Sequence, residues 1–304
     1  MNGENAGRDV FELLAARRQS GPKSQKRIAE YILESLSKAC FLIAARLGES
    51  VGVSESTVVR FAAELGYDGY PAFQRALQDA ARNKLTATER IEVLNRRLGD
   101  GEVLKSVLEN DISHISKTIE ETKESDFEAA VTSIINAKKI YIMGTRSSGA
   151  LASFMGYYFR LMLPNVILIR PGSQSEIYEQ LMRMESADLL IGISFPRYAK
   201  QTVNALAFAK DIGADSLAIT DSMDSPIAAN AGRVLLARSD MVSFVDSLVA
   251  PLSLINALIV AVSIKKRESV AAEFGRLERI WDEYDVFEKG DGPDGLGRGG
   301  VGGV

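Results

Sequence analysis

Five short apolar runs, separated by amphipathic segments, constrain the fold of this chain more than any other feature. Each run is apolar throughout, which is typical of parallel strands that are buried on both faces. The segments between the runs can supply the right-handed helical crossovers that join parallel strands. The pattern predicts a doubly wound α/β domain on a five-stranded parallel sheet, with strands at residues 139–143, 166–169, 189–194, 216–220 and 234–237.

Polar residues after the first predicted strand form a candidate anion site. Doubly wound sheets bind ligands beyond the carboxyl ends of their strands, where the strand order changes direction. The first strand leads into the run GTRSSG, which precedes an apolar helical segment and contains Thr145, Arg146, Ser147 and Ser148. Such a turn offers free N–H groups, hydroxyls and the positive end of a helix dipole to a phosphate or carboxylate. The alternative is that Ser147 or Ser148 only caps the helix.

Residues after the second and third strands extend this candidate site. Ser173 follows the second strand, and a helix cap is an equally good interpretation of it. Ser194, Arg197 and Tyr198 follow the third strand. A guanidinium group can hold a carboxylate or a phosphate through two parallel hydrogen bonds, so Arg197 and Arg146 together favour an anionic ligand.

The run GTRSSG also disfavours two nucleotide-binding loops. An ATP-binding P-loop needs a lysine and a serine or threonine after its second glycine, and this pair is missing. A dinucleotide loop needs a glycine where the chain has Arg146, and an acidic residue where it has Arg170. We therefore expect no cofactor.

The first part of the chain contains two helical patterns joined by a glycine turn. Apolar residues recur at helical spacing over residues 43–51, Gly52 permits a tight turn, and Ser54 is a good N-cap for a second helix. This is the helix-turn-helix layout, whose second helix enters the major groove of DNA. An ordinary helical hairpin is the alternative. On the polar face of the second helix, the residues expected to reach base edges are Ser56, Thr57 and Arg60.

A basic stretch and a tyrosine-rich turn flank these two helices. Residues 13–29 hold five cationic side chains and no acidic one, so a helix beginning near Ser24 would offer Lys23, Ser24 and Gln25 to DNA phosphates. A solvated surface helix is the alternative. After the second helix, Tyr67 and Tyr70 lie in a turn where they could flank a backbone phosphate. The full predicted DNA-contacting set, with the cap, is Lys23, Ser24, Gln25, Ser54, Ser56, Thr57, Arg60, Tyr67 and Tyr70.

Both parts of the chain resemble a known family. Residues 25–77, with RIAEYIL and LGESVGVSESTVVRFAAELGYDGYPAFQRAL, resemble the N-terminal domain of the RpiR-type bacterial transcription regulators. The second part of the chain resembles a sugar isomerase (SIS) domain, at residues 138–149 and in the run DLLIGISFPRYAKQTVNALAFAKDIGADSLAITD. This similarity extends over residues 140–264. The resemblance implies a DNA-binding regulator whose SIS domain senses phosphosugars.

The sequence departs from the SIS pattern in its second loop. The family's first loop, Gly-x-Gly-x-Ser-Gly, is matched by Gly144, Ser148 and Gly149. Its second loop, Ser-x-Ser-Gly-x-Thr, keeps Ser194, but the run FPRYA replaces the rest. The expected effector is therefore a small anionic metabolite, a phosphosugar or a sugar acid.

Acid-base residues for an isomerase are scarce. The single histidine, His114, falls on a predicted helix before the sheet, where a structural or interface role is favoured. Glu176 and Glu179 could approach a ligand, although acidic residues in a first helical turn usually interact with the helix dipole. We expect ligand sensing and no enzyme activity, with a sugar-phosphate isomerase carrying an accessory helical domain as the alternative. The single cysteine, Cys40, and the absence of zinc-ligand spacing predict no metal site.

The length of the chain indicates two domains, and its net charge is compatible with DNA binding. The 304 residues and net charge of −4 fit two domains with a locally basic DNA-binding face. We expect an all-α helix-turn-helix domain at 1–80, a helical linker at 81–103, the α/β SIS domain at 104–288 and a disordered glycine-rich tail at 289–304. The uncharged run 248–264 is too short and polar for a membrane span. The expected molecule is a cytoplasmic homodimer or tetramer that reads a two-fold symmetric operator in double-stranded DNA.

Overall fold

The computed structural model describes residues 10–82, 103–239 and 246–287. The predicted linker at 81–103 lies almost entirely outside these ranges, and the predicted disordered tail at 289–304 lies entirely outside them. The described N-terminal part contains only helices: α1 (Val10–Ser20), α2 (Lys23–Glu34), α3 (Leu36–Ala39), α4 (Ala44–Val51), α5 (Glu55–Glu64) and α6 (Gly69–Arg82). The prediction of an all-α first domain is confirmed for the described residues.

One apolar core holds these six helices together. The apolar stripe of α5 contributes Val58 and Phe61, which are fully or almost fully buried. The ring of Phe61 meets Phe73 of α6 edge-on, with 5.9 Å between ring centroids, a favourable arrangement for aromatic pairs. Because this face of α5 is fully used for packing, its opposite face is left at the surface.

The second domain is built on a five-stranded, all-parallel sheet in the order β2-β1-β3-β4-β5. Every predicted apolar run becomes a strand whose ends differ from the predicted ends by no more than one residue. The strands are β1 (Ile140–Gly144), β2 (Val166–Leu168), β3 (Leu189–Ile193), β4 (Asp215–Thr220) and β5 (Arg233–Leu236). The doubly wound α/β prediction is confirmed.

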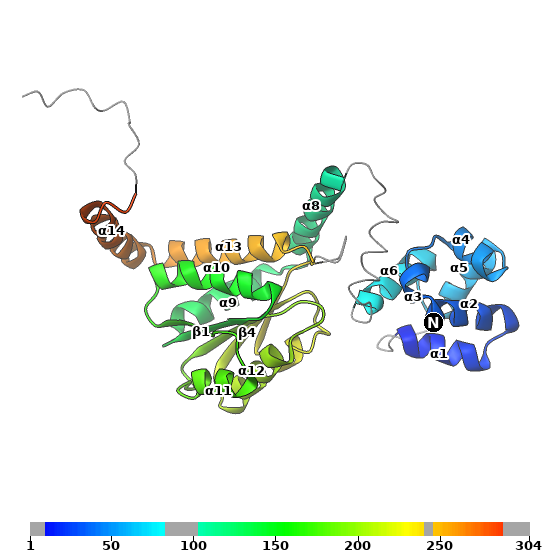
Figure 1. Ribbon diagram of the computed structural model, residues 1–304, viewed down its shortest axis with the longest axis horizontal. Helices are drawn as coiled ribbons and strands as arrows, with labels where there is room; N and C mark the ends of the chain where they lie inside the picture. The colour runs from blue at the N-terminus through cyan, green and yellow to red at the C-terminus, as the bar shows by residue number, and fades with distance from the viewer. Residues whose placement is uncertain (1–9, 83–102, 240–245, 288–304) are drawn as a thin grey trace, which may run out of the picture.

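Helices cover both faces of the sheet (Figure 1). On one face α9 (Glu124–Asn136), α10 (Ser147–Met162) and α13 (Val249–Lys265) pack into one core cluster, and on the other face α11 (Gln174–Leu181) and α12 (Lys200–Asp211) form a second. A short 3-10 helix, η1 (Ala228–Asn230), precedes β5, and α8 (Val103–Glu121) and α14 (Arg267–Glu283) complete the described elements.

All five strands are parallel, but the order in which the chain adds them to the sheet changes direction once, between β1 and β3. After β1 the chain crosses to β2 on one side, and it then returns to β3 on the other side of β1. Gly144 at the end of β1 is the register partner of Ile193 at the end of β3, so the loops that follow these strands begin side by side. This is the position at which doubly wound sheets bind ligands.

The apolar run near residue 250 forms α13, which lies against the sheet. Leu254, Ile255 and Leu258 are almost completely buried in its core. Among the described helices none is by itself long and apolar enough to cross a membrane, and α13 and α14 meet at a bend of 100°.

Candidate functional site

The second helix of the helix-turn-helix begins with a serine cap, as predicted. The Ser54 hydroxyl accepts a hydrogen bond from the Thr57 amide at 3.3 Å and lies 2.8 Å from the Thr57 hydroxyl. It also lies 2.9 Å from the Ser56 hydroxyl. Gly52 ends α4 in the left-handed conformation at φ 65°, which a glycine adopts without strain. The cap gathers three hydroxyls at the N-terminus of α5.

The polar face of α5 is accessible. Ser56 and Arg60 are exposed and Thr57 is half-buried. The Arg60 side chain is 70% exposed, and its Nε lies 3.9 Å from a Glu64 carboxylate oxygen one turn away. An exposed ion pair of this kind is weak, so the guanidinium is available to a base or phosphate at little cost. These three residues have the exposure that base contact requires.

The basic helix α2 brings a cationic side chain against this motif. Lys23 is exposed and Ser24 is half-buried at the start of α2. A side-chain carbon on Gly52 would lie 2.8 Å from Nη2 of Arg27, so the Arg27 guanidinium rests against the turn between α4 and α5. Arg27 was not among the predicted contacts, although its position one helical turn after Lys23 in the basic stretch was a usable signal.

Gln25 and Tyr70 were predicted to contact DNA, and the structure overturns both predictions. Gln25 is 6% exposed, and its amide nitrogen donates to a Glu64 carboxylate within the domain. Tyr70 is 5% exposed, its hydroxyl donates to the Leu42 carbonyl at 2.6 Å, and burial raises its pKa. Both polar groups are used inside the domain because α2 and α6 pack against α4 and α5. Tyr67 is half-buried, with its ring against Phe73.

The loop after β1 leaves two hydroxyls without partners. Thr145 is nine-tenths buried, and its hydroxyl has no hydrogen-bond partner. Ser148 is 5% exposed, and no described residue bonds its hydroxyl. Arg146 precedes α10 and forms no side-chain cap. In the first turn the Gly149 amide donates to the Arg146 carbonyl at 3.0 Å, so the amides of Ser147 and Ser148 are the ones left without an intrahelical acceptor. The alternative interpretation, in which Ser147 or Ser148 caps the helix, is therefore wrong.

In the loop after β3, two of the predicted site residues already form hydrogen bonds within the protein, unlike the hydroxyls of the loop after β1. The Ser194 hydroxyl accepts a hydrogen bond from the Ala199 amide at 3.2 Å. The Tyr198 hydroxyl donates to the Asp221 carboxylate at 2.8 Å. Arg197 is exposed and has a φ of 40°. We call the loops that follow β1 and β3, residues 144–149 and 194–199, the switch-point site. Asp221 was missed, although it directly follows β4 at the ligand edge of the sheet.

Ser173 acts as a helix cap, which confirms one of its two interpretations. Its hydroxyl accepts from the Glu176 amide at 3.3 Å, and its own amide donates to the Glu176 carboxylate at 2.6 Å. These bonds, the backbone bond first, hold the pKa of Glu176 below its usual range. A carboxylate with a lowered pKa is a poor general acid near neutral pH, which argues against an acid-base role for Glu176.

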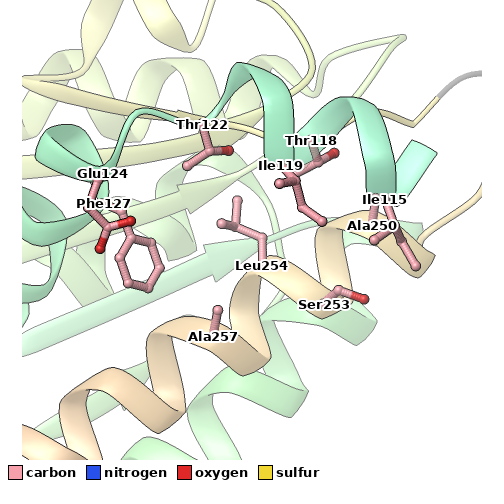
Figure 2. Close-up of a pocket in the computed structure, with 10 residues that line it drawn as sticks. All are labelled: Ile115, Thr118, Ile119, Thr122, Glu124, Phe127, Ala250, Ser253, Leu254 and Ala257. Atoms are coloured by element: carbon pink, nitrogen blue, oxygen red, sulfur yellow. The ribbon is translucent and has the colours of Figure 1, made fainter. Parts of the chain in front are cut away.

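A separate apolar pocket lies between α8, α9 and α13 (Figure 2). Its volume is about 360 Å³. Ile115 and Ile119 of α8, Phe127 of α9 and Leu254 of α13 are among its lining residues. His114 is 1% exposed on the same α8, close to the Asn110 amide. The pocket offers apolar contact area and few polar groups, unlike the strand-end loops.

Two family models match the chain. The model of the helix-turn-helix domain of the rpiR family matches residues 9–84, and the SIS domain model matches residues 133–261. An uncharacterized HTH-type transcriptional regulator of Haemophilus influenzae is 28% identical over 232 residues, 75% of this chain and 79% of that protein.

Two solved structures are similar to the chain. The sugar isomerase domain of an RpiR transcription factor from Sphaerobacter thermophilus is 30% identical with a TM-score of 0.57, covering 59% of this chain and 99% of that one. The NanR protein of Vibrio vulnificus, complexed with ManNAc-6P, shares the fold at 18% identity and a TM-score of 0.56, over 90% of this chain and 98% of that one.

Proposed function

Because the chain belongs to the RpiR family of helix-turn-helix transcriptional regulators with a SIS domain, we propose that a small anionic metabolite at its switch-point site controls operator binding by α5. One observation carries this proposal. A single chain combines a capped helix with an exposed polar face and a strand-end loop whose hydroxyls have no partner. Acting on the bacterial chromosome, the protein would work in the cytoplasm.

DNA contact is assigned to the N-terminus and polar face of α5. Ser54, Ser56 and Thr57 can donate to phosphates or base edges, and Arg60 can pair with a guanine through two hydrogen bonds. Lys23, Ser24 and Arg27 would contact the backbone phosphates and set the orientation of the domain. Tyr67 stays a candidate phosphate neighbour.

Metabolite binding is assigned to Thr145, Arg146, Ser147 and Ser148, with Arg197 from the neighbouring loop. The uncapped helix start and its free hydroxyls suit a phosphate. The NanR structure was solved with a phosphorylated sugar derivative, ManNAc-6P. We assign the effector to the same chemical group, a phosphosugar or a sugar acid. Ser173, Ser194 and Tyr198 would shape the site, since the hydroxyls of all three already have partners within the protein.

The first test is Ser148→Ala. The substitution removes one of the two free hydroxyls, so we expect effector affinity to fall by about 1 kcal/mol or more, roughly fivefold. Operator affinity without effector should not change, because Ser148 is in the other domain. Calorimetry with an active effector and a gel shift with the operator measure the two quantities. Equal effector affinity for both proteins would remove Ser148 from the site.

We propose that the SIS domain also forms the homodimer, through α8. Leu104, Leu108, Ile112 and Ile119 are all more than half exposed on this helix, and the apolar pocket lies beside Ile119. Apolar side chains at helical spacing favour burial against a second apolar surface. We assign this apolar surface of α8 to a second copy of the chain. Two copies bring together two recognition helices, which can then engage successive major grooves of DNA. Further pairing into a tetramer is compatible with this arrangement.

A charge at the centre of this surface tests the dimer. Ile112 is 63% exposed, so Ile112→Glu should leave the monomer folded but raise the dimer dissociation constant by about tenfold or more. Light scattering during size-exclusion chromatography measures the change. Lys117→Glu, an exposed position of the same helix, is the control that should stay dimeric. A dimeric Ile112→Glu protein would place the interface elsewhere.

We infer that the chain regulates and does not isomerise. The curated relatives include HexR proteins of Pseudomonas aeruginosa and Escherichia coli, whose names describe HTH-type transcriptional regulators. His114 is buried on α8, and Glu176 is a capping residue with a lowered pKa. Neither residue is suited to transfer protons at the switch-point site.

A further inference from the structure

Two arginines of the switch-point site adopt backbone conformations that glycine normally takes. Arg146 has a φ of 56° and a ψ of −129°, and Arg197 has a φ of 40°. In the SIS loop patterns both positions are glycine. A side chain at such backbone angles costs roughly 1–3 kcal/mol, which a glycine would avoid. The chain therefore carries two guanidinium groups at this edge of the sheet at a cost in stability.

The described residues provide neither arginine with an anionic partner. Both are exposed, and no hydrogen bond or ion pair joins their side chains to the rest of the described protein. By contrast, several cations elsewhere in this domain are paired, among them Arg233 with Asp215 and Lys138 with Glu185. The two positive charges of the site are thus available to a ligand.

The first loop alone can bind one phosphate. It supplies the hydroxyls of Thr145 and Ser148, the amides of Ser147 and Ser148 at the start of α10, and the guanidinium of Arg146. Thr145 is a buried hydroxyl without a partner, and leaving such a group unsatisfied is costly. These donors are sufficient for the three terminal oxygens of a phosphate monoester, so this anion does not need Arg197.

The second loop cannot hold a phosphate in the way its family pattern does. Pro196 has neither a hydroxyl nor an amide hydrogen, Ala199 has no hydroxyl, and the Ser194 oxygen already accepts from the Ala199 amide. What remains there is the single donor hydrogen of the Ser194 hydroxyl and the charge of Arg197, whose planar guanidinium matches a carboxylate through two parallel hydrogen bonds. The two loops begin side by side, because Gly144 and Ile193 are register partners.

We infer that the ligand is a phosphorylated sugar acid, with its phosphate on the first loop and its carboxylate on Arg197. This rests on the proposed function, because it assigns the effector to the same site. The probes are 6-phosphogluconate, glucose 6-phosphate and gluconate, together with 5-phosphoribonate and ribose 5-phosphate. Calorimetry on the full chain should give the phosphorylated acids about tenfold or more higher affinity than the matched phosphosugars, and higher affinity than gluconate.

The variant Arg197→Gly makes the test specific. It restores the residue that favours a positive φ, so the domain should fold with equal or higher thermal stability. Affinity for the phosphorylated acids should fall about tenfold, while affinity for the phosphosugars should stay within about twofold. Ser148→Ala should weaken both classes. Arg160→Ala, an exposed arginine in the last turn of α10, should weaken neither.

Three results would overturn the inference: equal affinity for acids and phosphosugars, equal losses for both classes in Arg197→Gly, and binding of none of the probes. The proposed function fails independently, if the full chain binds no genomic DNA fragment in a gel shift. A regulator that binds DNA and responds only to an uncarboxylated phosphosugar would keep the proposed function and refute the sugar acid.

Discussion

Arg60→Ala should lower operator affinity by roughly 1–3 kcal/mol for each half-site, about 5- to 150-fold, and abolish specific binding when both subunits carry it. The side chain is 70% exposed on the face of α5 opposite the core, and the ion pair that it forms within the described residues is a long one, to Glu64. Removing it should therefore leave folding nearly unchanged, within about 0.5 kcal/mol. Fluorescence anisotropy with operator DNA measures the affinity, and thermal unfolding measures the stability.

The matched control is Arg160→Ala, which removes an exposed arginine from α10 of the other domain. It changes the net charge by the same amount, so a loss of binding seen with both variants would report a general electrostatic effect. A base contact also predicts relaxed preference at one operator position. If Arg60→Ala keeps both its affinity and its sequence preference, α5 is not the recognition helix.

Gly144→Ala should damage the effector site more than any single loss of a ligand contact. A side-chain carbon at this position would lie 2.8 Å from the Ser148 carbonyl carbon and 3.1 Å from the Ala152 side chain. These are backbone and core atoms of α10 and cannot move aside freely. We expect the first turn of α10 to shift, at a cost of roughly 1–3 kcal/mol in stability, with effector affinity reduced by about a hundredfold.

Gly275→Ala is the control for this substitution. Gly275 lies inside α14, and nothing lies within 4 Å of a side-chain carbon built on it. The same chemical change should there stabilise the protein by about 0.5–1 kcal/mol and leave effector binding unchanged. Differential scanning calorimetry and effector titration of both variants separate the two effects. Wild-type effector affinity in Gly144→Ala would show that the first loop does not hold the ligand.

Local patterns were sufficient to predict the fold because each strand is buried on both faces. The run at residues 189–194 is apolar for that reason, and it became β3 with one boundary shifted by a single residue. The cap at Ser54 and the turn at Gly52 were predictable as well, since both depend on interactions within a few residues. The order β2-β1-β3-β4-β5 is one of the common orders of doubly wound sheets, and the apolar runs alone do not distinguish it from the others.

The site was only partly predictable, because exposure depends on contacts between distant segments. Tyr70 and Gln25 are polar residues in suitable positions along the chain, yet contacts with Leu42 and Glu64 draw them into the domain. Whether Ser173 caps a helix or contacts a ligand could not be decided until its bond with Glu176 was seen. The positive φ of Arg197 could not be recognised without the backbone.

Operator affinity with and without effector tests most directly whether the switch-point site and α5 are coupled. Anisotropy titrations of the full chain should differ by about 5- to 150-fold between saturating effector and none, in either direction, which corresponds to a coupling of about 1–3 kcal/mol. By reciprocity, operator DNA should change effector affinity by the same factor. Identical operator affinity with every compound that binds the SIS domain would contradict the account.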